Sequence, residues 1–230
     1  MSNSIESKKV PVSSLVAKPQ PAFIDQCQRC GICCQKGGPA LHKEDVLLIE
    51  KGCIPAKNLF TLRKGEMAFD NVHGHAVPLE DEIIKIKGRD GSWVCCFYDP
   101  TAHACRIYDS RPVECRVLVC WNTTEIEQIY AHDRLTRRDL LASVGGLWEI
   151  VQTHERWCAY RKIEKWVPQI KSGNGTARAA LGEIVAYDRH LRSLAVAKSG
   201  ITPALLDFLF GRPLSETLLK MYNLNLKKRR

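Results

Sequence analysis

The sequence lacks long apolar runs and the glycine-rich signatures of nucleotide-binding proteins. Residues 1–9 hold no apolar stretch of the kind that opens a secretory signal, and no later segment approaches the roughly 18 apolar residues of a membrane helix. The chain has no Gly-x-Gly-x-x-Gly segment, no phosphate-binding loop and no Ser/His/Asp order that indicates a hydrolase. These absences predict a cytoplasmic protein without a membrane span.

Positive charge is in excess, with a formal net charge of +9. Such a charge favours nucleic acid or another acidic partner, but the count treats all 11 cysteines as neutral thiols. A four-thiolate zinc site, or a cubane iron–sulfur cluster with four thiolates, carries about −2, so two such centres would lower the charge to roughly +5. The charge therefore gives little support to nucleic acid, and another protein is the expected partner.

Cysteine is the abundant reactive residue. An odd number of 11 cysteines cannot all pair within one chain, and a reducing compartment does not favour a disulfide framework. With 45% hydrophobic and 26% charged residues, the chain has enough apolar material to form a core without the help of a metal. Metal ligation is therefore the leading use of the thiols.

The 230 residues divide by composition into three parts. Residues 1–22 show no hydrophobic period and are predicted to be a flexible leader. Residues 23–122 hold ten of the eleven cysteines and are predicted to be a metal-binding module, whereas residues 123–230 show helical periodicity. The predicted fold class is α+β, mainly α, with a cysteine-rich irregular module and a small β-hairpin packed on a helical C-terminal half.

Local patterns place several elements within these parts. Residues 42–50 predict a short helix ended by Gly52, and residues 82–87 and 92–98 predict a hairpin around a turn at 89–91. This hairpin would deliver cysteines to the module. Helices are predicted in the C-terminal half at 136–152, 153–170, 176–198, 203–210 and 214–222.

The strongest motif is Cys27-x2-Cys30-Gly31-x-Cys33-Cys34, which places four thiols within eight residues. Gly31 relieves backbone crowding there. The spacing matches the beginning of a ferredoxin-type cluster segment, although the later C-x3-C-P element is missing. Adjacent cysteines are awkward ligands for one small ion, whereas a larger cluster or two centres use them more easily. The motif therefore favours iron–sulfur over zinc.

A second group of cysteines is spread over a longer stretch, at Cys95, Cys96, Cys105, Cys115 and Cys120. The spacings are too long for a self-contained zinc knuckle. Such thiols can complete the first cluster, hold a second one, or pack as small apolar side chains.

Together the two groups resemble the bacterial YkgJ-type CxxCxxCC family, a zinc- or iron-chelating domain. The resemblance covers about residues 23–120 and continues through Cys95-x-Phe-x-Asp and Cys105-x-Ile-Tyr-x2-Arg-Pro-x2-Cys115-Arg. Cys96 and Cys158 fall outside it. It implies metal ligands at Cys27, Cys30, Cys33, Cys34, Cys95, Cys105 and Cys115, with Cys120 as an eighth. The cysteine segment is also similar to that of flagellin lysine methylases, which are associated with an iron–sulfur cluster. The expected cofactor is therefore a 4Fe-4S cluster, with Zn²⁺ as the alternative.

Other polar residues give weaker signals. Arg111 and Arg116 flank Cys115 and can donate hydrogen bonds to sulfide or thiolate, which would tune a cluster, or they can simply stabilise a turn. His73 and His75 are expected to be solvated. The remaining histidines lack a mutual spacing that builds a site, and the sequence assigns no histidine partner to Cys96 or Cys158, which are expected to be structural thiols.

Three functions are compatible with these observations. The leading hypothesis is an iron–sulfur protein that transfers electrons, senses redox state or supports a partner enzyme. The second is a zinc-binding module whose helical half binds another protein. The third is a methyltransferase-like activity on protein lysines, which the short chain and the missing nucleotide signature weaken. The chain is not expected to be an independent enzyme.

Overall fold

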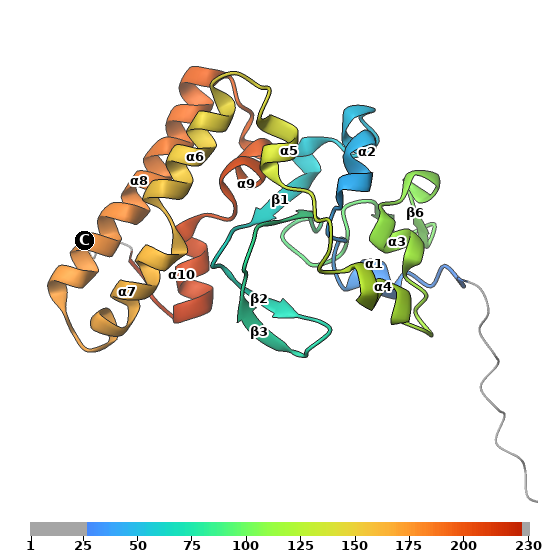
Figure 1. Ribbon diagram of the computed structural model, residues 1–230, viewed down its shortest axis with the longest axis horizontal. Coiled ribbons are helices and arrows are strands. Elements are labelled where there is room, and N and C mark those ends of the chain that lie inside the picture. Colours follow the sequence, from blue (N-terminus) through green and yellow to red (C-terminus); the bar gives the residue numbers. More distant parts are fainter. Residues whose placement is uncertain (1–26, 227–230) are drawn as a thin grey trace, which may run out of the picture.

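The computed structural model describes residues 27–226, and the predicted leader, residues 1–22, lies outside this range (Figure 1). The fold is α+β and mainly helical, as predicted. The helices are α1 (Ile32–Gln35), α2 (Val46–Glu50), α3 (Val113–Val117), α4 (Thr124–Ile129), α5 (Arg137–Leu141), α6 (Leu147–Trp157), α7 (Tyr160–Lys171), α8 (Gly175–Ser199), α9 (Leu206–Phe210) and α10 (Leu214–Tyr222), with short 3₁₀ turns η1 (Lys43–Asp45), η2 (Ala56–Asn58), η3 (Tyr108–Ser110) and η4 (Pro203–Leu205).

In the described part of the chain, six short strands form three antiparallel pairs: β1 (Leu59–Leu62) with β4 (Ile83–Ile86), β2 (Met67–Asp70) with β3 (His75–Pro78), and β5 (Tyr98–Asp99) with β6 (Ala104–Cys105). Residues 39–41 run beside β4, where the Leu41 N–H donates to the Ile84 carbonyl at 2.9 Å and the Ile86 N–H donates to the Pro39 carbonyl at 3.1 Å. The β1–β4 pair is therefore the frame on which the N-terminal cysteine segment is placed.

The predicted hairpin between residues 82–87 and 92–98 is wrong in its pairing. β4 pairs with β1 instead, in a register that sets Leu59 opposite Ile86. The predicted turn is present, with Asp90 and Gly91 both at positive φ. After the turn the chain pairs briefly with residues 87–89, through a bridge between Gly88 and Cys95 and a hydrogen bond from the Cys96 N–H to the Lys87 carbonyl at 3.0 Å. β4 pairs with β1 rather than with residues 92–98 because this pairing buries apolar side chains of both strands.

The helical C-terminal half follows the prediction closely, with different breaks. The predicted helix 136–152 is split into α5 and α6, because Gly146 adopts a φ of +75° before α6 begins. The next break falls at Cys158 rather than at residue 152. The predicted helix 42–50 is present as η1 and α2. Within the described range, no helix combines the length and the apolar character that crossing a membrane requires.

Two clusters of buried side chains hold these elements together. The first joins β1 and β4 to helices α5, α6, α8 and α9; Cys95 is part of it, and Cys34, Cys96 and Cys105 pack against it. The second joins α7, α8 and α10. The cysteine-rich module is thus packed on the helical half, as Figure 1 shows. The boundary predicted at residue 122 stays a prediction.

Buried ion pairs cross the same junction between strands and helices. Arg137 on α5 donates from Nε to Glu82 at 2.9 Å, from Nη2 to Glu155 at 2.8 Å and from Nη1 to the Leu209 carbonyl at 2.6 Å. Arg63, which is fully buried, lies 3.5 Å from the same Glu155 carboxylate. A buried charge is tolerated only when it is paired, so these contacts fix how the helices sit on the strands.

Candidate metal centre

The first cysteine run lies on a loop and a single helical turn. Cys27 and Cys30 are exposed on the loop, and Cys33 and Cys34 lie on α1. Gly31, at the start of α1, has a φ of +74°, and a Cβ there would collide with the ring of the buried Tyr98. Only glycine satisfies both demands, which agrees with the predicted reason for Gly31.

Backbone contacts bring later cysteines to this helix. The Cys95 N–H donates to the Cys34 carbonyl at 2.8 Å, and the β5–β6 register sets Cys105 opposite Tyr98. Cys115 is presented by α3. Five of the predicted ligands therefore approach one another from separate segments of the chain: Cys33, Cys34, Cys95, Cys105 and Cys115.

The thiols of this group affect one another's ionisation. The Sγ atoms of Cys33 and Cys34 lie 3.9 Å apart, and the hydrogen bond between them lowers the pKa of Cys33 to about 6 while raising that of Cys34. Burial raises the pKa of Cys115, and the nearby charges of Cys95 and Cys105 raise it further. Crowded thiolates repel one another, so the group ionises fully only with a cation among them. Metal ligation needs thiolates and supplies that positive charge, so the donor set fits a metal centre.

The adjacent residues Cys95 and Cys96 have different surroundings. The charge of Cys95 acts on Cys34, Cys105 and Cys115. The thiol of Cys96 instead accepts a hydrogen bond from Asn58 at 3.5 Å. A hydrogen bond from Cys95 lowers the pKa of Cys96 to about 7. The burial of Cys95 and its main-chain bond to Cys34 also favour Cys95 as the ligand of the pair.

Arg111 and Arg116, the two arginines predicted to influence the metal ligands, contact different groups. Arg111 stacks over the Tyr108 ring, 3.7 Å from its centroid, and its charge acts to lower the pKa of Cys33 and of Cys105. Arg116 donates to the Arg111 carbonyl at 2.8 Å and pairs with Glu44. Arg111 therefore lies near the thiols, while Arg116 holds the main chain of Arg111. Their influence on a metal stays a prediction.

The remaining cysteines are placed less centrally. Cys27, Cys30 and Cys120 are exposed, and the half-buried Cys53, to which the sequence assigns no role, follows α2. His73, in the β2–β3 turn, and His75, at the start of β3, are exposed, as expected, and His73 pairs with Asp70 at 2.9 Å. The predicted ligand roles of Cys27, Cys30 and Cys120 stay predictions.

The spacing of the sulfur atoms bears on the kind of metal. In a tetrahedral zinc site with bonds of about 2.3 Å, neighbouring sulfurs lie about 3.8 Å apart. Cys33 and Cys34 meet this separation, but within residues 27–226 no three of the thiols lie within 4.8 Å of one another. The described thiols are thus spaced more widely than a single four-coordinate ion requires.

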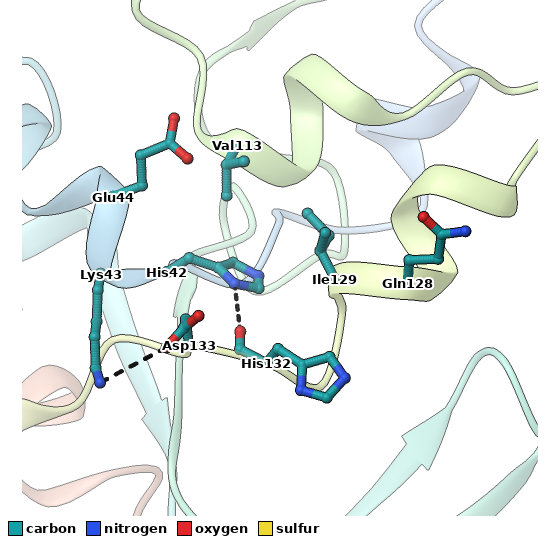
Figure 2. A pocket seen from close by; sticks show the side chains of 8 residues that line it. All are labelled: His42, Lys43, Glu44, Val113, Gln128, Ile129, His132 and Asp133. Carbon is teal, nitrogen blue, oxygen red and sulfur yellow. Dashed lines mark hydrogen bonds and ion pairs between the residues drawn. The ribbon is translucent and has the colours of Figure 1, made fainter.

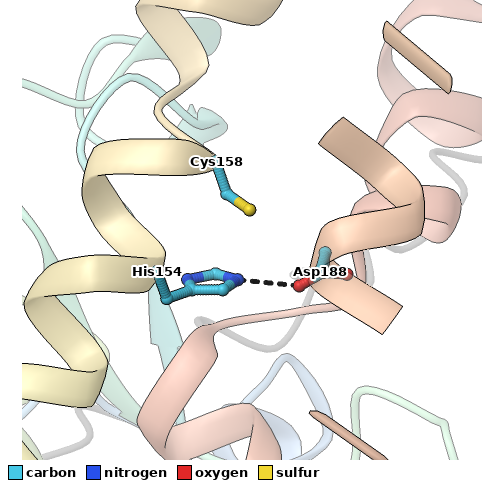
Figure 3. Close-up of side chains that lie close together, drawn as sticks. All are labelled: His154, Cys158 and Asp188. Atoms are coloured by element: carbon cyan, nitrogen blue, oxygen red, sulfur yellow. Dashed lines mark hydrogen bonds and ion pairs between the residues drawn. The ribbon is translucent and has the colours of Figure 1, made fainter. Parts of the chain in front are cut away.

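Within the described range, one group of three residues does place its potential ligand atoms within 4.8 Å of one another: His154, Cys158 and Asp188 (Figure 3). All three are buried, and His154 lies 2.8 Å through Nε2 from Asp188. The sequence analysis overlooked that His154 precedes Cys158 by four residues, about one helical turn, near the end of α6.

Hydrogen bonding makes this trio a structural network. Arg63 Nη1 lies 3.5 Å from His154 Nδ1, and because a guanidinium only donates, Nδ1 accepts and Nε2 carries the proton given to Asp188. Neither ring nitrogen is left for a metal or for the Cys158 thiol. Burial raises the pKa of Cys158 to about 12, and Arg192 also donates to Asp188, at 2.9 Å. Two guanidinium groups at the trio disfavour a divalent cation.

A polar network that the sequence analysis missed lies next to α3. His42, to which the sequence assigns no role, is buried, with Nδ1 2.8 Å from the His132 carbonyl (Figure 2). Its Nε2 lies 3.3 Å from Glu114. These partners are 90 and 72 residues away, so no local spacing signals them. His42 also lines a pocket of about 340 Å³ whose charged residues pair with their neighbours, Lys43 with Asp133 and Glu44 with Arg116. The pocket therefore selects no ligand charge.

Comparison with known families gives one match. Residues 26–133 match the CxxCxxCC family, described as a "putative zinc- or iron-chelating domain". This match confirms the resemblance seen in the cysteine pattern. Comparison with curated proteins and with solved structures gives no match. The chain therefore carries a metal-binding domain of the zinc- or iron-chelating class, followed by a helical part that the family match does not cover.

Proposed function

We propose that the cysteine module holds one or two thiolate-ligated iron–sulfur clusters of the 4Fe-4S type, and that the protein transfers electrons, senses redox state or supports a partner enzyme. The observation that carries this proposal is the arrangement of five thiols, drawn from separate segments, that approach one another at spacings wider than one ion needs. The residues that would hold metal are Cys27, Cys30, Cys33, Cys34, Cys95, Cys105, Cys115 and Cys120.

When bound, such a cluster exchanges single electrons, and the chain supplies the surroundings that tune this exchange. Phe97 and Tyr98, two and three residues after Cys95, are buried in the same apolar cluster as Cys95, so this ligand is anchored in the core. Arg111 places a positive charge beside Cys33 and Cys105, where it would offset the negative charge of a thiolate-bound cluster. The eight cysteines are enough for two four-thiolate centres.

One observation favours the alternative, a zinc-binding module that binds another protein. The 3.9 Å separation of the Cys33 and Cys34 sulfurs is close to that expected for two thiolates on one zinc ion. Zinc would require further thiols, such as Cys95 or Cys115, to move inward. It would then act as a structural centre without redox chemistry.

The test is elemental analysis of the full chain purified without oxygen. Iron, acid-labile sulfide and zinc are counted per chain, together with visible absorption. Iron and sulfide in matching amounts would support the cluster, and four or eight irons per chain would separate one centre from two. Zinc in stoichiometric amount without sulfide would overturn the proposal. Cys158→Ser is the matched control, because Cys158 lies in the helical network and its loss should leave the metal content unchanged.

A further inference from the structure

Cys115 is carried by the five-residue helix α3, which is too short to be stable alone. Its first N–H group, that of Val113, donates to Oδ1 of Asp45 at 2.9 Å. The other oxygen of Asp45 accepts from the His42 N–H at 3.0 Å. Asp45 has no exposed surface. One buried carboxylate thus ties the start of α3 to the segment that contains His42.

A second carboxylate makes a parallel connection. Glu114, the residue before Cys115, accepts from the Ala40 N–H through Oε2 at 2.7 Å and lies 3.3 Å from His42 Nε2 through Oε1. Its side chain is 12% exposed. Each carboxylate therefore reaches both α3 and residues 40–42. We call Asp45, Glu114 and His42 the α3 clamp.

Residues 40–42 are themselves fixed on their other side. Leu41 is bonded to β4 through the Ile84 carbonyl, and Gly38 lies so close to Ile86 that a Cβ would collide with it. This segment begins six residues after Cys34. The α3 clamp thereby connects Cys115 to β4, the same strand that fixes the chain just after Cys34. Cys34 and Cys115 lie about eighty residues apart in the sequence.

We propose that Asp45 and Glu114 are positioning residues that hold Cys115 in place for metal ligation. A buried carboxylate is costly unless its oxygens are hydrogen-bonded, and here three of the four contacting groups are main-chain N–H groups, so the acids fix backbone position. Partners that orient a metal ligand typically contribute 10–100-fold to metal affinity. The inference rests on the proposed metal centre, but it requires only that Cys115 is a ligand.

The experiment is a double-mutant cycle on the full chain. Metal release to a chelator is timed for the wild type, Glu114→Ala, Cys115→Ser and the double variant, with retained iron and zinc both counted. We expect Glu114→Ala to speed release at least about 10-fold. In the Cys115→Ser background the same change should alter release less than about twofold, because a positioning residue acts only through the ligand that it holds. Equal acceleration in both backgrounds, or none in either, would overturn the inference.

A matched control separates positioning from general stability. Glu82→Ala removes a carboxylate of similar exposure, 15%, which is bonded to Arg137 rather than to α3. It should lower the free energy of unfolding without a tenfold change in metal release. If Glu114→Ala does not fold, as judged by far-ultraviolet circular dichroism, Asp45→Asn replaces it in the same cycle. Zinc in the wild type would refute the iron–sulfur proposal and still leave the cycle readable.

Discussion

Cys95 and Cys34 are joined through the main chain, the N–H of Cys95 donating to the carbonyl of Cys34 at 2.8 Å. Each residue belongs to a pair of adjacent cysteines, so this bond aligns Cys33–Cys34 with Cys95–Cys96. The alignment gives the two members of the second pair different surroundings: Cys95 lies among the other thiols, and Cys96 lies beside Asn58.

The first prediction concerns this difference. Cys95→Ser should remove a ligand and lower the bound metal by half or more, because the Cys95 charge acts on three other thiols of the site. Cys96→Ser should leave the metal content within about a fifth of the wild-type value, since a serine hydroxyl can still accept from Asn58. Metal per chain after gel filtration checks both variants. Loss of metal in Cys96→Ser alone would contradict the assignment.

Gly31 and Gly52 provide a second, internally controlled prediction. Both adopt a φ of +74°, but a Cβ at Gly31 would meet the Tyr98 ring, whereas a Cβ at Gly52 would meet nothing within 4 Å. Gly52→Ala should therefore cost about 1–2 kcal/mol of unfolding free energy, the penalty of a left-handed residue. Gly31→Ala should cost more and also lower metal content, because α1 must move. Urea unfolding and metal analysis are the measurements, and equal costs would contradict the steric argument.

Arg111 carries the third prediction. If a cluster is present, Arg111→Met removes a positive charge beside Cys33 and Cys105 and should lower the reduction potential by tens of millivolts. Arg116→Ala should produce a smaller shift in the same direction, since Arg116 acts by holding the Arg111 main chain. Potentiometric titration of both variants beside Arg138→Met, an exposed arginine on α5, gives the comparison. Identical midpoints in all of the proteins would remove the tuning role.

How much of the site the sequence predicts depends on distance along the chain. The run from Cys27 to Cys34 is local, so its spacing alone indicates ligation. The α3 clamp joins residues 68 to 74 positions apart, and no pattern in one sequence specifies such a pairing. The family resemblance implies that the distant residues Cys105 and Cys115 are ligands, but it assigns no role to Asp45 or Glu114.

The fold divides in the same way. Helical periodicity locates both ends of α8 and α10 closely because each helix carries its own apolar face, whereas the helix predicted from residue 153 begins only at Tyr160, as α7. The hairpin prediction failed because residues 82–87 and 92–98 are adjacent and strand-like, whereas the partner chosen by packing, β1, lies more than twenty residues earlier. Partner choice in a sheet depends on what each strand buries, which local propensity does not encode.

The buried ion pairs give a fourth prediction. Arg137→Met leaves the carboxylates of Glu82 and Glu155 without one of their guanidinium partners, which should cost about 3–5 kcal/mol of unfolding free energy. Arg138→Met, at the exposed neighbouring position, should change stability by less than about 0.5 kcal/mol. Denaturant unfolding of the two variants tests the difference, and similar stability in both would mean that the buried network contributes little.

The fifth prediction follows from His154. Burial is the largest influence on this imidazole and lowers its pKa below the ordinary value of 6.5. As the pH falls through about 6.5, the unfolded chain takes up a proton that the folded chain does not, so the free energy of unfolding should decrease. His154→Gln should lose less stability than the wild type between about pH 7.5 and pH 5.5. Acid effects on the metal centre are common to both chains, so parallel pH profiles would contradict the prediction.

The hydrogen bond from Thr61 on β1 to the Phe208 carbonyl of α9, 2.7 Å long, sets a practical condition for protein engineering. Thr61 lies inside the family segment and Phe208 far outside it, and the apolar side chains around both share one core. A fragment cut after residue 133 would expose that core to water and invite aggregation. Grafting the cysteine module into another protein would therefore require carrying α9 with it, or redesigning the face of the β1–β4 pair that α9 covers.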